Sequence, residues 1–291
     1  MRVGLQLPHF RPSTPQTMGR WFTEIAQAAD SSGFYSMFVM DHFFQIGRWL
    51  GEPENPMVEG YTTLGYLAGV TQHLKLGLMV GAVIYRYPAV VIKSISTLDV
   101  LSGGRAYFSI GAAWNEYESV SLGLYFPPLK ERFEQLEDIL RMAHHMWSGD
   151  TSAFKGKHVH ATYPYNNPQP LSKPHPPILI GGMGRTKTLR YIAQYGDACN
   201  FFAGAGDESL KEHLAILRTH CAEVGRPYEE IEKTTLLTIR PNEQSMEQIY
   251  QQIAHLNELG FSHAIMNVNG DYTPQLIEEL AQKVVQPAAT L

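Results

Sequence analysis

A glycine-rich turn that directly follows an apolar run has the residue types of a phosphate site. The run is residues 178–180, and Gly181, Gly182, Met183, Gly184 and Arg185 follow it before a helical pattern begins. Glycine lets the backbone approach an anion closely, and the N–H groups at the start of a helix donate hydrogen bonds to it. The segment therefore predicts a phosphate-binding loop, which is typical of an enzyme with a phosphorylated cofactor.

Asp41 and His42 come directly after another apolar run, residues 36–40. An imidazole titrates near neutrality, so a histidine at a strand end suits proton transfer over a bound ring. A lone histidine is more often a loop cap or fills a polar pocket. A position at the mouth of a parallel barrel reverses this preference and favours a catalytic role for His42.

Two more strand ends carry candidate ligand contacts. The run over residues 75–83 contains Gly77 and Gly81, which allow a flat ligand to lie against the backbone or, equally, are packing glycines. After residues 106–110 come Gly111 and, three residues later, Trp114, a group that can stack on a ring. Trp114 is equally readable as a loop anchor, and the nearby Glu116 and Glu118 as ordinary solvated carboxylates.

Composition indicates a compact soluble protein that binds a small molecule. The 291 residues are 44% hydrophobic and 18% charged, which is enough for a sizeable core. A net charge of −5 with scattered Lys and Arg argues against nucleic acid and anionic membranes as partners. No apolar run has the length of a membrane span, and nothing indicates export.

The two cysteines and the histidine spacing disfavour disulfides and metal sites. Cys199 and Cys221 both lie in apolar segments, so neither a disulfide framework nor a cysteine zinc site is expected. This usage fits a reducing cytoplasm. No HExxH or similar carboxylate–histidine spacing occurs, and a metal-dependent barrel hydrolase is therefore disfavoured.

Alternating strand and helix patterns predict a single (β/α)8 TIM barrel over residues 1–291. Helical spacing of apolar residues follows the strands, and near-continuous apolar strands are typical of a closed parallel barrel. A doubly wound sheet is the alternative, but it usually carries its glycine fingerprint after the first strand. The predicted strands are residues 3–7, 36–40, 74–80, 106–110, 178–180, 198–202, 234–239 and 263–268.

Three stretches interrupt this alternation and are expected to cross the barrel mouth. They are residues 43–59, 112–130 and 151–176, and the last is rich in proline, which suggests a stiff extended crossing. Aromatic residues in these stretches predict a fairly apolar substrate pocket. They are Phe43, Phe44, Trp49 and Tyr165.

Five phrases of the sequence together resemble the luciferase-like monooxygenase family, and in particular its branch that depends on the deazaflavin coenzyme F420. The resemblance spans nearly the whole chain and implies a (β/α)8 barrel with a flavin-type ring at the mouth. The phrases are GFYSMFVMDH at 33–42, LGLMV at 76–80, YRYPA at 85–89, TLDVLSGGR at 97–105 and ILIGG at 178–182.

The resemblance also implies roles for particular residues. A cis peptide that props the ring is expected at Met79-Val80 or one residue later, next to Gly81. The histidine near the reactive ring atoms corresponds to His42, with Asp41 beside it, so His42 is expected to act as an acid/base or to polarise the ring. Sugar-phosphate dehydrogenases of this branch carry a glutamate where this chain has Trp114, which argues against sugar-phosphate oxidation.

The expected function is hydride transfer between F420 and a small organic substrate. FMN with reduced flavin and oxygen, as in a monooxygenase, is the first alternative, and a barrel that binds a ligand without turnover is the second. Members of the family commonly dimerise through early barrel helices, so a homodimer is expected. The candidate helices here follow Gly60 and span residues 91–98.

Overall fold

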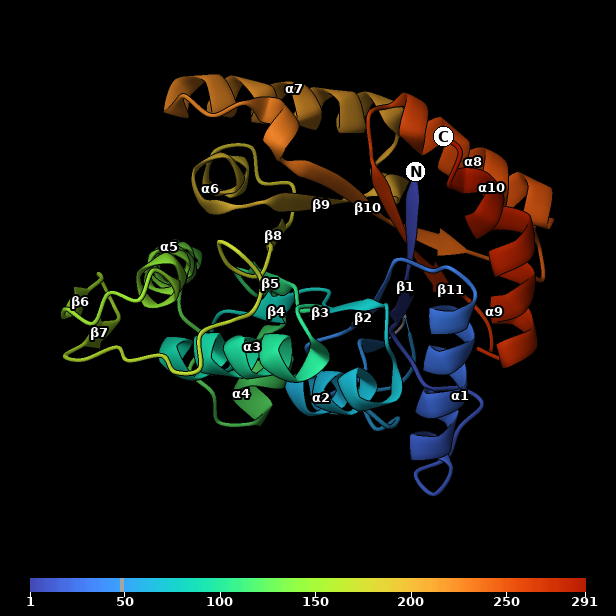
Figure 1. The fold of residues 1–291 in the computed structure, drawn as a ribbon, viewed down its shortest axis with the longest axis horizontal. Helices are drawn as coiled ribbons and strands as arrows, with labels where there is room; N and C mark the ends of the chain where they lie inside the picture. Colours follow the sequence, from blue (N-terminus) through green and yellow to red (C-terminus); the bar gives the residue numbers. More distant parts are fainter. Residues whose placement is uncertain (48–49) are drawn as a thin grey trace.

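The short apolar segments form parallel strands that close into a barrel surrounded by helices (Figure 1). The computed structural model describes residues 1–47 and 50–291, so Trp49 lies outside the described residues. Strands follow one another around the barrel in the order β3-β2-β1-β11-β10-β9-β8-β5-β4, and all neighbours in this sheet pair in parallel. A bridge between Leu76 and Ala106 joins β3 to the segment just before β5 and nearly completes the ring.

All eight predicted strands are present, and the doubly wound alternative is wrong because β1 pairs with β2 on one side and with β11 on the other. β4 is a short extension of the third strand beyond residue 80, and β6 and β7 form a separate antiparallel hairpin. The bounds are β1 Arg2–Leu7, β2 Ser36–Val39, β3 Lys75–Leu78, β4 Gly81–Ala82, β5 Phe108–Gly111, β6 Phe154–Lys155, β7 His160–Ala161, β8 Ile178–Gly181, β9 Ala198–Phe202, β10 Glu232–Ile239 and β11 His263–Val268.

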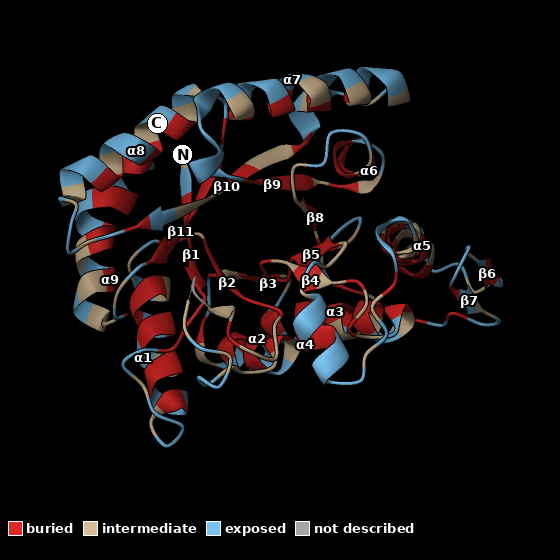
Figure 2. Cartoon of the chain, turned by 180° about the vertical axis from the view of Figure 1, so that it is seen from behind, coloured by how far each residue is buried: buried red, intermediate tan, exposed pale blue. Residues whose placement is uncertain are grey.

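Helices cover the outside of the barrel with their apolar faces turned inward, and exposed residues concentrate on the outer faces of helices such as α7 (Figure 2). Within the described residues, no helix is both long and apolar enough to cross a membrane. The bounds are α1 Met18–Ser31, α2 Gly60–Val70, α3 Pro88–Ser102, α4 Glu116–Ser121, α5 Leu129–Trp147, α6 Thr188–Tyr195, α7 Asp207–Val224, α8 Met246–Glu258, α9 Pro274–Leu280 and α10 Gln286–Ala288.

Local sequence explains where these helices begin and end. α3 starts with Pro88 in its first turn, where the missing N–H is not needed, and is capped at its carboxyl end by Gly103, whose φ of 72° is left-handed. α8 starts with a reciprocal capping box between Ser245 and Gln248. Such signals fix the loops between helices and strands, and hence the strand ends that form the site.

The barrel interior is filled at its lower end, where the strands begin, and open at its mouth, where they end. Large side chains such as Phe38 and Tyr107 fill the middle. Below them, buried His263 lies 2.9 Å from both Glu232 and Ser36. Towards the mouth, Gly111 and Gly181 replace large side chains, so that space remains at the carboxyl ends of the strands, where barrel enzymes bind ligands.

The proline-rich stretch 151–176 runs along the outside of the barrel, so the prediction that it crosses the mouth is wrong. Asp138 on α5 accepts the N–H groups of residues 157–159, and Asp99 on α3 accepts the N–H and hydroxyl of Ser172. The physical reason is that α5 returns the chain to the face opposite the mouth before this stretch begins. The other two stretches do contribute residues to the mouth, among them Ile46 and Leu129.

Candidate active site

A cavity of about 910 Å³ opens at the carboxyl ends of the strands and collects most of the predicted site residues. Gly184 and Arg185 are the exceptions, because they do not line it. The predicted residues that line the cavity are Asp41, His42, Met79, Val80, Gly81, Gly111, Trp114, Gly181, Gly182 and Met183.

Val80 and two glycines form the floor of this cavity. The Met79-Val80 peptide bond is cis, as predicted. A β-carbon on Gly181 would lie 2.8 Å from both γ-methyl groups of Val80, and one on Gly111 would lie 3.1 Å from one of them. Only glycine leaves room for Val80 at Gly181, so two neighbouring strands present bare backbone around a small apolar side chain.

Polar side chains inside the barrel lie at the edge of this floor. Asn267 donates to Gln6 at 2.9 Å, and the Thr234 hydroxyl donates to Oδ1 of Asn200 at 2.9 Å. Within the described chain these bonds leave the Nδ2 group of Asn200 and Oδ1 of Asn267 without protein partners, so the cavity offers both a donor and an acceptor. These residues are not among the site residues predicted from the sequence, although a polar residue at an inward strand position was the available signal.

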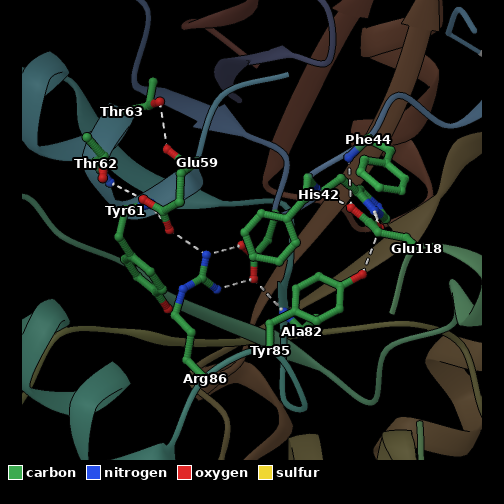
Figure 3. A network of polar contacts seen from close by, with 12 residues as sticks. His42, Phe44, Glu59, Tyr61, Thr62, Thr63, Ala82, Tyr85, Arg86 and Glu118 are labelled. Carbon is green, nitrogen blue, oxygen red and sulfur yellow. Dashed lines mark hydrogen bonds and ion pairs between the residues drawn. The ribbon is translucent and has the colours of Figure 1, made fainter. Parts of the chain in front are cut away.

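His42 is held by a buried carboxylate, Glu118 (Figure 3). Its Nδ1 atom lies 2.7 Å from Oε2 of Glu118, whose side chain has 0% exposure. The imidazole of His42 also lines the cavity. The arrangement is a histidine–carboxylate pair whose imidazole faces ligand space, and it suits proton transfer. The reading of Glu118 as a solvated carboxylate is wrong, because α4 folds it back under the loop after β2.

Several hydrogen-bond donors converge on Glu118. The N–H groups of Phe43 and Phe44 donate to Oε1, and Tyr85 donates to Oε2 at 2.8 Å. Burial alone would raise the pKa of Glu118, but the hydrogen bond and charge of His42, with the Phe43 and Tyr85 donors, outweigh it and lower this pKa. The carboxylate is therefore held in its ionised form.

Asp41 has a different set of contacts from its neighbour His42. Its two oxygens accept a bidentate pair from Arg86 at 2.8 and 2.9 Å, and the N–H of Ala82 donates to it at 2.9 Å. Arg86 also pairs with Glu59, which caps α2 through the N–H of Thr62 at 2.7 Å. Asp41 thus ties the end of β2 to β4 and to the start of α2.

Trp114 lies beside His42, with ring centroids 5.6 Å apart. The preceding residue, Ala113, has a left-handed φ of 61°, and Arg132 on α5 donates to the carbonyls of Ala112 and Ala113. These bonds hold the turn that presents Trp114 to the cavity. Trp114 as a whole is 60% exposed, so a ligand could cover it.

The glycine-rich turn after β8 approaches the cavity with its backbone, but Arg185 contacts α7 instead of the cavity. Gly182 has a φ of 112°, a conformation that favours glycine, and a β-carbon on Gly184 would lie 2.7 Å from the hydroxyl of Thr188. Arg185 pairs with Glu212 on α7 at 2.7 Å. The loop therefore keeps its close backbone approach to the cavity through Gly182 and Met183, while the arginine contacts a helix.

The aromatic residues predicted to form a substrate pocket are dispersed. Phe43 and Phe44 follow His42 and contact Glu118 through their backbones. Tyr165 lines a separate groove across α2 and α3. The apolar wall of the mouth cavity comes instead from residues that include Leu129, Phe133 and Phe202. The expectation of an apolar lining holds for these residues.

Comparison with known sequences gives relatives along most of the chain. An uncharacterized protein of Mycobacterium tuberculosis (strain ATCC 25618 / H37Rv) is 25% identical over 274 residues, which cover 89% of this chain and 92% of the relative. The F420-dependent glucose-6-phosphate dehydrogenase of Kineococcus radiotolerans is 30% identical over 234 residues, covering 77% of this chain and 65% of that enzyme.

Comparison with solved structures confirms the fold. An F420-dependent secondary alcohol dehydrogenase in complex with an F420-acetone adduct superposes with a TM-score of 0.82 at 18% identity, over 99% of this chain and 98% of that one. The luciferase-like monooxygenase family matches residues 1–285. This protein therefore belongs to the luciferase-like monooxygenase family.

Proposed function

We propose that this protein is an oxidoreductase that transfers a hydride equivalent between coenzyme F420 and a small organic substrate, with His42 as the acid/base. The observation that carries the proposal is the position of His42 and the Val80 floor around one cavity. The floor can therefore support a flat ring, while the imidazole of His42 serves a substrate above that ring.

The residues of the cavity fit a deazaflavin. Val80, Gly111 and Gly181 offer a surface without large side chains, and Asn200 and Asn267 offer a donor and an acceptor to the polar edge of a ring. The loop after β8 would hold the phosphate through the backbone N–H of Met183, because the N–H of Gly182 already donates to the carbonyl of Asn200 at 3.2 Å. When bound, F420 supplies a ring carbon that accepts or gives a hydride.

The side chains around this floor take separate roles. His42 holds or accepts the proton of the substrate oxygen. Trp114 covers the substrate from the side of α4. Asp41, which pairs with Arg86, keeps the end of β2 in place and so positions His42, while Met79 and Gly81 form the backbone on either side of Val80.

F420 is favoured over FMN by relatives. The Kineococcus radiotolerans enzyme named above depends on F420 and aligns with 77% of this chain. The family description, luciferase-like monooxygenase, supports FMN with oxygen as the alternative chemistry. Because Trp114 stands where sugar-phosphate dehydrogenases of this branch carry a glutamate, we propose a substrate other than a sugar phosphate.

A turnover assay tests this proposal. Oxidised F420 would be mixed with a panel of alcohols, and reduced F420 with the matching ketones and aldehydes, with glucose 6-phosphate as a further substrate. We expect turnover of at least one neutral alcohol–carbonyl pair and none of glucose 6-phosphate. Tight binding of F420 without turnover of any substrate would favour the barrel that binds without catalysis.

We also propose a homodimer through α2 and α3. Large apolar side chains remain exposed on this face, Leu101 with 72% of its surface and Val90 with 57%, and they flank a groove of about 690 Å³. Contiguous exposed apolar surface of this kind marks interaction sites. Light scattering of the intact protein and of Leu101→Glu tests it: we expect a dimer that the variant weakens, and a wild-type monomer at micromolar concentration would contradict it.

A single domain over residues 1–291 and a cytoplasmic location remain predictions.

A further inference from the structure

The geometry points to Glu118 as a positioning residue that fixes the tautomer of His42, so that Nδ1 carries the proton and Nε2 is the nitrogen that serves the substrate. We infer this from the contacts of Glu118 alone. Its catalytic consequence rests on the proposed acid/base role of His42, whereas the tautomer itself is independent of that role and of which cofactor binds.

Among the residues that the structure describes, every group within hydrogen-bond distance of the Glu118 carboxylate is able to donate. Two are backbone N–H groups and one is an amide NH2, and these cannot accept. Burial, followed by the hydrogen bond to Glu118, raises the pKa of the Tyr85 hydroxyl, so this group also stays protonated. The donors are Phe43 N, Phe44 N, Asn115 Nδ2 at 3.1 Å, Tyr85 Oη and His42 Nδ1.

An ionised carboxylate only accepts hydrogen bonds. With Nδ1 of His42 2.7 Å from Oε2, the imidazole must therefore donate its Nδ1 proton to Glu118. In neutral imidazole the other nitrogen then has a free lone pair. During alcohol oxidation, Nε2 can accept the proton of the substrate hydroxyl. In the reverse direction, the protonated Nε2 can donate its proton to the carbonyl oxygen that is being reduced.

The loop contacts show why a carboxylate rather than an amide is needed here. A glutamine at position 118 would have one oxygen for this set of donors. The N–H groups of Phe43 and Phe44 cannot reverse, so they would take that oxygen, and the amide NH2 would turn towards His42 and Tyr85. Nδ1 would then have to accept, and the imidazole proton would move to Nε2.

NMR of the apoprotein tests the tautomer without any cofactor. The protein would be labelled with 15N in its histidines, and the signals of His42 assigned by their loss in His42→Ala. On the high-pH plateau of the titration, we expect the Nδ1–H form in wild-type protein and the Nε2–H form in Glu118→Gln. A wild-type His42 in the Nε2–H form would overturn the inference even if the variant fails to fold.

Two control variants separate the carboxylate from its surroundings. Tyr85→Phe removes one donor but leaves the bond from His42, so the Nδ1–H form should persist. Glu116→Gln changes an exposed carboxylate on the same short helix, α4, and should leave both tautomer and activity unchanged. A shift of the His42 signals to the Nε2–H form in Glu116→Gln would contradict a specific role for Glu118.

Kinetics then test the catalytic consequence. In Glu118→Gln we expect kcat for alcohol oxidation to fall by about 10² to 10⁴-fold with KM nearly unchanged, which is the range that general acid–base catalysis contributes. Glu118→Asp should restore part of the rate. A folded Glu118→Gln protein with the Nε2–H form and full activity would refute the acid/base role of His42, while the assignment of the tautomer to Glu118 would stand.

Discussion

Nδ1 of His42 lies 2.7 Å from Oε2 of Glu118, a residue 76 positions further along the chain. The contact joins the end of β2 to the short helix α4 that follows β5. Because two strand ends and an inserted helix must all be in place to make this contact, the site is a product of the closed barrel and its second insertion.

Replacing His42 with alanine tests its catalytic role. We expect kcat/KM to fall by about 10² to 10⁴-fold, since the substrate oxygen would lose its proton acceptor. The cofactor Kd should change little, because the floor at Val80 is untouched. His255→Ala, an exposed histidine on α8, is the matched control and should keep full activity. Equal losses in both variants would point to a general effect on the fold.

Gly181→Ala tests the floor of the cavity. The new methyl group would lie 2.8 Å from the methyls of Val80, so either Val80 or the strand must move. We expect the cofactor to bind at least about tenfold more weakly, and the free energy of unfolding to fall by about 1–3 kcal/mol, the usual cost of overpacking. Gly204 lines the same cavity, but a β-carbon added there would have no atom within 4 Å, so Gly204→Ala should bind the cofactor as the wild type does.

The positions of the strand ends could be predicted from the sequence, because each strand is a short apolar run that a turn residue follows. His42, Gly81, Gly111 and Gly181 could therefore be placed around one mouth before the fold was known. Glu118 could not, because in the sequence it resembles a solvated residue of an amphipathic turn. Its burial depends on hydrogen bonds to the loop after β2, which only the tertiary structure brings near.

Arg86→Met tests the ion pairs of Arg86 with Asp41 and Glu59, which hold β2, β4 and the start of α2 together. Removing the guanidinium would leave the buried Asp41 carboxylate without its ion partner, and we expect the free energy of unfolding to fall by about 3–5 kcal/mol. The double variant Asp41→Asn/Arg86→Met should recover part of this loss, because no unpaired charge remains. Urea unfolding measures both. Arg20→Met, on an exposed pair with Glu24, should change stability by less than about 0.5 kcal/mol.

The acid stability of the protein should depend on Glu232 at the lower end of the barrel. Burial alone would raise its pKa, but the hydrogen bond and charge of His263, with Arg2 and Tyr107, outweigh it and lower the pKa below the ordinary 4.5. The contribution of ionised Glu232 to the free energy of unfolding is therefore complete above pH 4.5. It is lost as the pH falls through the lower pKa that Glu232 has in the folded protein.

Urea unfolding at a series of pH values between about 3 and 7 measures this effect. In Glu232→Gln the free energy of unfolding should be lower at neutral pH and should fall less steeply with acid than in the wild type. An acid limb of the same slope in both proteins would show that other carboxylates are responsible.

The path of residues 151–176 shows a second limit of sequence reasoning. Its prolines correctly indicated that it forms no helix, but they carry no information on which side of the barrel it lies. That side is set by α5, which ends at the face opposite the mouth, and by Asp138 and Asp99, which bind the segment to the outer helices. Trp114, by contrast, could be placed at the mouth from its short distance to a strand end.

Titration of the apoprotein with F420 and, separately, with FMN tests the central claim most directly. Ligand fluorescence would give both dissociation constants, and the same titrations with His42→Ala would show whether ring binding is independent of the acid/base residue. We expect F420 to bind at least about tenfold more tightly than FMN, a difference of about 1.4 kcal/mol, in both proteins. Tighter binding of FMN, or binding of neither ring, would contradict an F420-dependent oxidoreductase.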